Sequence, residues 1–235
     1  MKLFIITISM LLYSYFSLSF EEKHLAQLVR TNVCISCDLT NANLSKMNFT
    51  KANLSGSNLS YANLSSADFS YSDLSFVSLV KSKAYIANFN NANLEGANLS
   101  EAKFNGANLF NANLMDATLI STVFSKSNAQ EITLDGSHLK YTKFRGAELM
   151  NAKFSGSYLT MADFSGANLT GAVMIAIDLS NSVFVSAKLD NVNFRDSNVS
   201  GMNFAKFSLK KTNFINSVMC DVFVPWSEKK IKCEN

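Results

Sequence analysis

Proline is almost absent from this 235-residue chain, and glycine is scarce. The sequence contains one proline at position 225, one tryptophan at position 226, and nine glycines. Because proline and glycine mark most loops and tight turns, their scarcity argues against a string of separate small domains. The sequence therefore indicates one continuous object over most of its length.

The sequence also lacks an excess of charge of one sign and any cluster of catalytic residue types. Lys and Arg number 21 against 18 acids, and the formal net charge is +3. Such a balance gives no strong attraction to nucleic acid, so we expect no nucleic-acid partner. His24 and His138 are far apart and have no metal-ligating neighbours in the sequence. We therefore expect no catalytic residue, metal or cofactor.

The N-terminus differs from the rest of the chain. Met1 and Lys2 precede an apolar run that has no charge before Glu21, with small residues at Ser17 and Ser19. This pattern predicts a secretory signal peptide over residues 1–19, and export to a periplasm, a lumen or the extracellular space without further membrane contact. The alternative is an uncleaved anchor, because the run barely reaches the roughly 18 to 20 residues that span a bilayer.

From Leu39 to Met219, every fifth residue belongs to one series of 37 central positions. Leu fills 20 of them and Phe 12, and only Ala84 and Ala129 lack bulk. Two residues before each centre, Ala occurs 17 times and Ser, Thr or Cys 13 times. Small and large residues two apart point to one side of an extended chain, with the intervening polar residue outward. A period of five fits neither a helix nor a continuous strand.

A second period of twenty residues predicts how these segments stack. Four pentapeptides would make one turn of a square coil, and phenylalanines twenty apart would then lie above one another. We predict that this column forms the structural core: Phe104, Phe124, Phe144, Phe164, Phe184 and Phe204.

The repeating units "ANLSG", "ADFSG" and "ANLTG" resemble the A(D/N)LXX consensus of pentapeptide repeat proteins. The resemblance covers residues 37–220 and implies an all-β fold, a right-handed quadrilateral β-helix of about nine coils. At roughly 4.8 Å between stacked strands the rod would be on the order of 44 Å long. The small centres at residues 81–86 and around Ala129 allow two interpretations, a local distortion or a drifted repeat whose smaller centre is tolerated. The register preserved on both sides favours the drifted repeat, since an inserted loop would usually shift it.

Both ends of such a rod need covering. Residues 20–36 predict a capping helix and a lead-in segment, with Leu25, Leu28 and Val29 toward the coil. Residues 221–235 predict a second cap, with an apolar lid formed by Val222, Phe223, Val224 and Trp226. An uncovered terminal coil would instead pair with a second copy and give a homodimer.

The four cysteines lie two at each end of the repeats. Four cysteines in an exported protein suggest two disulfides, and a bridge requires Cα atoms within about 7 Å. Since the rod separates its ends by more than this, the predicted pairs are Cys34–Cys37 and Cys220–Cys233. The segment "CISCDL" also resembles the lead-in of exported and thylakoid-lumen members of the family. A redox or zinc CxxC is the weaker reading, since no second ligand pair exists.

The predicted function is that of a non-catalytic exported scaffold that binds an unknown protein partner through rows of Asn, Ser and Lys. The alternative is a DNA mimic that inhibits or protects a type II topoisomerase, as some relatives do. Such mimicry requires a continuous acidic face, whereas residues 37–219 hold 13 acids against 15 bases.

Overall fold

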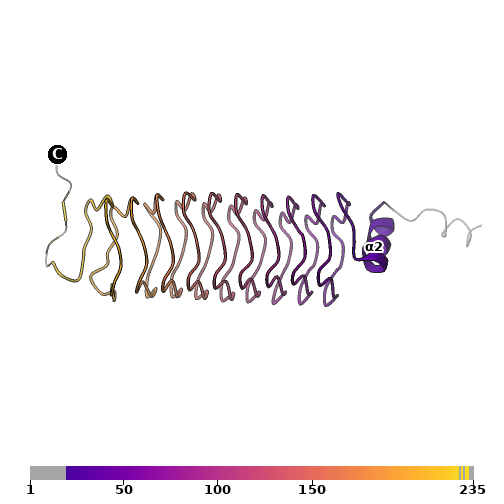
Figure 1. The fold of residues 1–235 in the computed structure, drawn as a ribbon, viewed down its shortest axis with the longest axis horizontal. Helices are drawn as coiled ribbons and strands as arrows, with labels where there is room; N and C mark the ends of the chain where they lie inside the picture. The colour runs from indigo at the N-terminus through magenta and orange to yellow at the C-terminus, as the bar shows by residue number, and fades with distance from the viewer. Residues whose placement is uncertain (1–19, 228, 230, 233–235) are drawn as a thin grey trace, which may run out of the picture.

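The computed structural model describes residues 20–227, 229 and 231–232 as a straight rod (Figure 1). Coils stack from helix α2 (Phe20–Thr31) at one end towards the C-terminal segment at the other. The predicted signal peptide and Cys233 lie outside the described residues. Within the described part, no helix is long and apolar enough to cross a membrane.

The rod is held by isolated parallel β-bridges that join residues twenty apart. They run from Val33↔Asn53 to Asn203↔Phe223, and the described residues contain no longer strand. Four pentapeptides therefore make one coil, as the twenty-residue period predicts, and the fold is a repeat β-helix. The hand of the coil and the count of about nine coils stay predictions.

Each side of the square ends in a tight turn. The Ala42 N–H donates to the Leu39 carbonyl over 3.0 Å, and Asn41 between them has φ 60°. A positive φ at the third of four residues is the conformation of a type II turn. It recurs at every fifth position from residue 36 to residue 221, with one exception at Lys206. All nine glycines occupy such positions; at Gly96 a Cβ atom would also lie 2.6 Å from the Phe76 ring.

The centres of the repeats fill the interior with stacked rings. Phe104, Phe124, Phe144, Phe164 and Phe184 lie in successive coils, with ring centroids 4.9 to 5.4 Å apart. Each buried ring stabilises the fold by about 2 to 3 kcal/mol. Phe204 does not extend this stack: its ring contacts Phe194, Phe207 and Phe214.

At both small centres the structure has a drifted repeat rather than a distortion, as the preserved register predicts, because the backbone hydrogen bonds there stay regular. Ala84 is fully buried, and its N–H donates to the Lys103 carbonyl over 2.8 Å. Phe104 lies in the next coil above Ala84 and contacts Phe89 at 5.1 Å, so the phenylalanine stack changes face there without a gap. At Ala129, the fully buried Ile132 in the following small site supplies the missing volume.

Two small-site serines differ in one hydrogen bond. Ser82 and Ser72 are both buried, but the Ser72 hydroxyl donates to the Phe69 carbonyl over 2.6 Å, whereas the Ser82 hydroxyl has no partner. Because an unpaired buried hydroxyl costs about 1 to 3 kcal/mol, Ser82→Ala is expected to raise the free energy of unfolding by about 1 kcal/mol. Ser72→Ala should lower it by a similar amount. Urea unfolding of both variants tests this, and a shift of the same sign in both would contradict it.

Helix α2 packs on the first coil through fewer apolar side chains than predicted. Leu28 is fully buried and Leu25 partly so, but Val29 is 55% exposed, which corrects the prediction. The Asp38 N–H donates to Nδ1 of His24 over 2.9 Å, so the contacting stripe includes His24 and leaves Val29 at its margin. Asn32, with φ 57°, ends the helix.

The Cys34–Cys37 disulfide follows α2, with the Cα atoms 5.5 Å apart. The Ser57 hydroxyl donates to the Cys34 carbonyl over 2.5 Å and accepts the Cys37 N–H over 2.9 Å. These bonds attach the bridged segment to the next coil. Cys220 is disulfide-bonded as well, and its predicted partner, Cys233, lies outside the described residues.

At the C-terminal end, the predicted lid is only partly formed. Val222 and Val224 are buried and Phe223 is half-buried, but Trp226 is 64% exposed, contrary to prediction. An antiparallel bridge joins Val222 to Ile231, so Trp226 lies in the intervening loop rather than over the last coil.

Candidate binding surfaces

The rows of Asn and Ser, which the sequence suggested as a display surface, are largely occupied by bonds within the rod. Oδ1 of Asn53 accepts the N–H and the hydroxyl of Ser55 over 3.0 and 2.9 Å. Between coils, the amide of Asn108 donates to Asn88, and that of Asn128 to Asn108, each over 3.1 Å. Asparagine in this position therefore stabilises the turn and the stack. A partner is better recognised by the residues that depart from the repeat.

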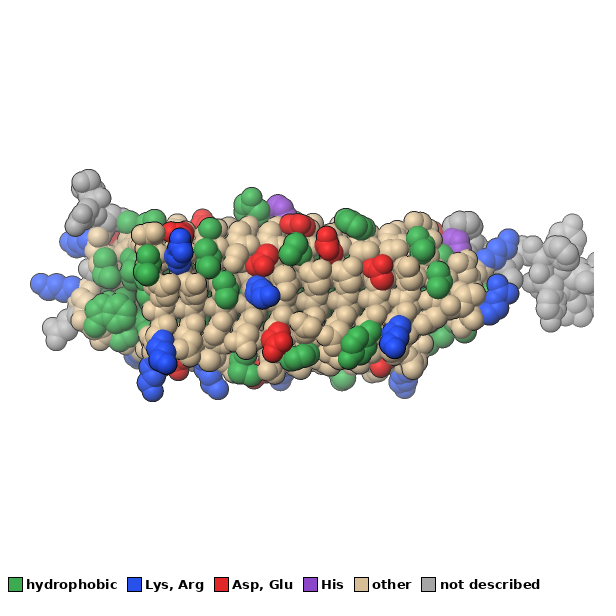
Figure 2. Space-filling model, in the orientation of Figure 1, with side chains coloured by type: hydrophobic (Ala, Val, Ile, Leu, Met, Phe, Trp, Pro, Cys, Tyr) green, Lys and Arg blue, Asp and Glu red, His purple; other side chains and the backbone are tan. Residues whose placement is uncertain are grey.

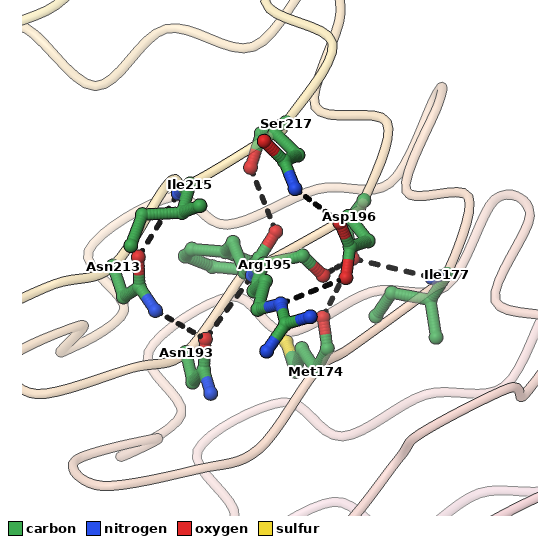
Figure 3. Close-up of polar contacts among 11 residues, drawn as sticks. Met174, Ile177, Asn193, Arg195, Asp196, Asn213, Ile215 and Ser217 are labelled. Atoms are coloured by element: carbon green, nitrogen blue, oxygen red, sulfur yellow. Dashed lines mark hydrogen bonds and ion pairs between the residues drawn. The ribbon is translucent and has the colours of Figure 1, made fainter.

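Figure 3 shows the same arrangement in the late coils. The Asn213 amide donates to Oδ1 of Asn193 over 3.0 Å, and the Arg195 N–H donates to the same oxygen over 3.1 Å. The Arg195 guanidinium pairs with Asp196 over 2.9 Å. Even the charged corner side chains here are engaged with neighbours.

Aspartates in the outward row make stability depend on pH. Burial raises the pKa of Asp68, but hydrogen bonds from Ser70 and from the Asn88 amide outweigh this and lower it below its ordinary value. A lowered folded pKa stabilises the fold above the unfolded pKa of about 3.9, and this stabilisation is lost as pH falls through the folded pKa. Asp68→Asn keeps the acceptor without the charge. The wild type is therefore expected to be more stable than the variant at pH 7, and the difference should shrink as pH falls below about 3.9 and be lost below the folded pKa. A thermal-unfolding difference that is constant with pH would contradict this.

Exposed apolar side chains occur at several corners of the rod, and one group of them lies on adjacent coils at one face and its corner. His138 bridges to Tyr158 on this face, and at the adjoining corner the Tyr141 N–H donates to the Thr160 carbonyl, which places Met161 one coil beyond Tyr141. Tyr158 is 61% exposed, and Met161 and Tyr141 about as much as each other, 45% and 44%. We call this surface the aromatic patch; it consists of Ile120, His138, Tyr141, Tyr158 and Met161.

Two side chains of the aromatic patch contact each other across coils. The rings of His138 and Tyr158 stack with centroids 4.8 Å apart. The Lys140 ammonium lies 5.2 Å from the centre of the Tyr141 ring. Tyrosine and methionine are enriched in protein interfaces, because they bury large areas and tyrosine retains a polar hydroxyl. The patch therefore has the composition of a protein contact.

The fold also brings together, on one face, lysines that are scattered in the sequence. Lys83 bridges directly to Lys103, and Lys143 lies two coils further along the same face. On the face in Figure 2, by contrast, acidic, basic and apolar side chains are interspersed over a mainly uncharged polar surface. Lys83 and Lys103 are twenty residues apart, and so are Tyr141 and Met161. This spacing is the feature of the sequence from which the lysine column and the aromatic patch could have been predicted.

The two histidines are not brought together. His24 lies in α2 and holds the first coil, whereas His138 belongs to the aromatic patch in the middle of the rod. Among the described residues, no three His, Cys, Asp or Glu side chains form a group that could hold a metal ion.

Comparison with known proteins gives the family. A model described as "Pentapeptide repeats" matches with eight copies over residues 37–75, 48–83, 87–114 and 117–156. A second, "Pentapeptide repeat region", matches residues 147–223. The chain therefore belongs to the pentapeptide repeat family. No curated protein matches it.

Several solved structures match this chain, each with a TM-score below 0.5. HetL, involved in heterocyst differentiation regulation in the cyanobacterium Nostoc sp. strain PCC 7120, is 25% identical, with a TM-score of 0.46 over 84% of this chain and 91% of that one. QnrB1, a plasmid-mediated fluoroquinolone resistance protein, is 21% identical, with a TM-score of 0.40 over 69% and 88%. A protein of the Arabidopsis thaliana thylakoid lumen is 30% identical, with a TM-score of 0.30 over 49% and 66%.

Proposed function

We propose that this protein is a non-catalytic, exported rod of about nine coils that binds a protein partner through the aromatic patch. The observation that carries the proposal is the gathering of Tyr141, Tyr158 and Met161, each 44% or more exposed, on adjacent coils. The polar rows around them are engaged in bonds within the rod, whereas the patch exposes apolar side chains on consecutive coils, as protein-contact sites do.

Export is part of the proposal and has separate support. Residues 1–19 have the composition of a signal peptide. The Cys34–Cys37 disulfide is typical of proteins in oxidising compartments. Topoisomerase protection by DNA mimicry is the alternative, and Lys83 and Lys103, adjacent on one face, run against the continuous acidic surface that it requires.

Affinity isolation from the compartment that holds the native protein tests the patch. The variant Tyr141→Ser, Tyr158→Ser, Met161→Ser is expected to recover at least about tenfold less partner than wild type, since interface tyrosines carry much of the binding energy. The control replaces three exposed side chains elsewhere, Tyr71, Tyr85 and Ile86, by Ser and should recover the wild-type amount. Equal recovery by both variants, or recovery of a type II topoisomerase by wild type, would overturn the proposal.

A further inference from the structure

One seam between adjacent coils is open. The Leu179 N–H donates to the Asn198 carbonyl and the Asn191 N–H to the Lys210 carbonyl, both in the regular pattern. Between these points, over the described residues 181–190 and 200–208, the equivalent bonds are missing. The amides of Phe184, Ser186 and Leu189 make no backbone bond to the next coil, and the bridges expected for Val183 and Lys188 are absent.

Large side chains in the small sites account for the opening. Phe207 and Met202 occupy positions where the repeat usually has Ala. The Phe207 ring packs edge to face against Phe204 at 6.0 Å, and Lys206 before it is the one turn position that lacks the left-handed conformation. The separated coils enclose a cleft of about 870 Å³, within the range of roughly 300 to 1,000 Å³ typical of ligand sites.

The cleft offers backbone groups, apolar walls and a basic rim. Both coil edges present N–H and C=O groups in the spacing of a parallel ladder. The walls include Phe184, 5% exposed, and Met202, 7% exposed. Lys188 and Lys206 are exposed at the rim. The one acid there, Asp190, already accepts the Lys210 N–H over 3.1 Å and the Ser208 hydroxyl, so it neutralises neither lysine directly.

We propose that this cleft binds an extended, acidic peptide segment of a partner protein, which adds a strand between the two coils. Polypeptide is the ligand whose alternating donors and acceptors match such an edge. The apolar walls accept alternate side chains of the strand, and the lysines favour a carboxylate beside them. The cleft lies apart from the aromatic patch, so the inference goes beyond the proposed function and does not depend on it.

The chain itself contains a suitable probe. Residues 62–71, "ANLSSADFSY", occupy in an earlier coil the same two sides of the square as residues 182–191 and 202–211. A capped synthetic peptide of this sequence can therefore present the regular ladder pattern, with its aspartate on the side of Lys188. Two control peptides replace that aspartate (Asp68→Lys) or a ladder-forming leucine (Leu64→Pro), which removes an N–H.

Hydrogen exchange of the full folded chain gives the first readout. In the free protein, the amides of Phe184, Ser186 and Leu189 should exchange about a hundredfold faster than their equivalents one coil earlier, Phe164, Gly166 and Leu169. The peptide should slow these three amides and leave the others unchanged. Equal exchange in both sets would show a closed seam and overturn the proposal.

Titration with fluorescent peptide gives the second readout. The lysine peptide should bind at least about tenfold more weakly, and the proline peptide should lose binding. In the protein, the double variant Lys188→Glu, Lys206→Glu should weaken peptide binding about tenfold without a change in melting temperature. The control variant Lys81→Glu, Lys83→Glu should bind the peptide as tightly as the wild type. Phe207→Ala should close the seam and abolish binding. The proposal would be overturned if all three peptides bound equally, or if only the lysine peptide bound. It would also be overturned if the Lys188/Lys206 variant bound the peptide as tightly as the wild type.

Discussion

Truncation of Phe144 to Ala is expected to lower the free energy of unfolding by about 3 to 5 kcal/mol, the cost of removing a fully buried aromatic side chain. Phe144 is in the middle of the ring stack, with Phe124 and Phe164 at 5.2 and 5.1 Å and Phe154 edge-on at 6.0 Å. Neighbouring coils cannot collapse into the space, because the backbone ladder fixes their separation.

Chemical unfolding of Phe144→Ala measures this loss, and Phe76→Ala is the matched control. Phe76 is a phenylalanine of the same rod but is 69% exposed at a corner, so its truncation should change stability by less than about 0.5 kcal/mol. Similar losses in the two variants would show that the ring stack is not the source of stability.

Replacement of Ala107 by Phe is expected to cost about 3 kcal/mol, at the upper end of the usual range for overpacking a core. Ala107 is fully buried, and its N–H donates to the Phe104 carbonyl over 3.1 Å. The site lies in the same column as Phe207, whose N–H donates likewise to Phe204 over 2.9 Å. The variant therefore reproduces the wedge of the late coils within the regular part of the rod.

Hydrogen exchange distinguishes this wedge from a general loss of stability. Ala107→Phe should accelerate exchange at the amides of Ala84, Ile86 and Phe89 before distant coils are affected, because these amides donate to carbonyls of the coil that contains Ala107. The control, Ala107→Ser, introduces a residue common at small sites and should leave these amides protected. Uniform acceleration along the rod would refute the local mechanism.

Most of the fold follows from the sequence, because burial and turn geometry are repeated at fixed intervals. The five-residue series from Leu39 and the twenty-residue column from Phe104 are each determined by local steric rules that the chain meets again in every coil. The ends obey no such repetition. Whether Val29 and Trp226 are buried depends on how one short helix and one loop dock, and both predictions were wrong.

At the small centres, the preserved register was a better guide than the size of a single residue. Ala84 and Ala129 left a distortion open as the alternative, but Phe104 and Ile132 supply the volume from neighbouring sites. The actual opening arises at Phe207, where the excess volume is in the small site rather than at a centre. The sequence contains this signal, and its effect depends on the packing of Phe204 beside it.

The aromatic patch could be predicted only by knowing which residues of successive coils are neighbours. Tyr141 and Met161 are twenty residues apart, and Tyr158 joins them because its face adjoins their corner. No five-residue pattern marks these positions, since the outward and corner sites vary more from coil to coil than the centres and the small sites do. The proposed binding surface therefore consists of residues that depart from the repeat consensus.

The most direct test of the account is photocrosslinking in the native compartment with a benzophenone amino acid at single outward positions. At Tyr158, in the aromatic patch, it should yield one defined crosslinked protein. At Asn108, in an asparagine row on another face and four coils from Lys188, it should yield none. Equal crosslinking at both positions, or crosslinking at Asn108 alone, would contradict a scaffold that binds its partner through the aromatic patch.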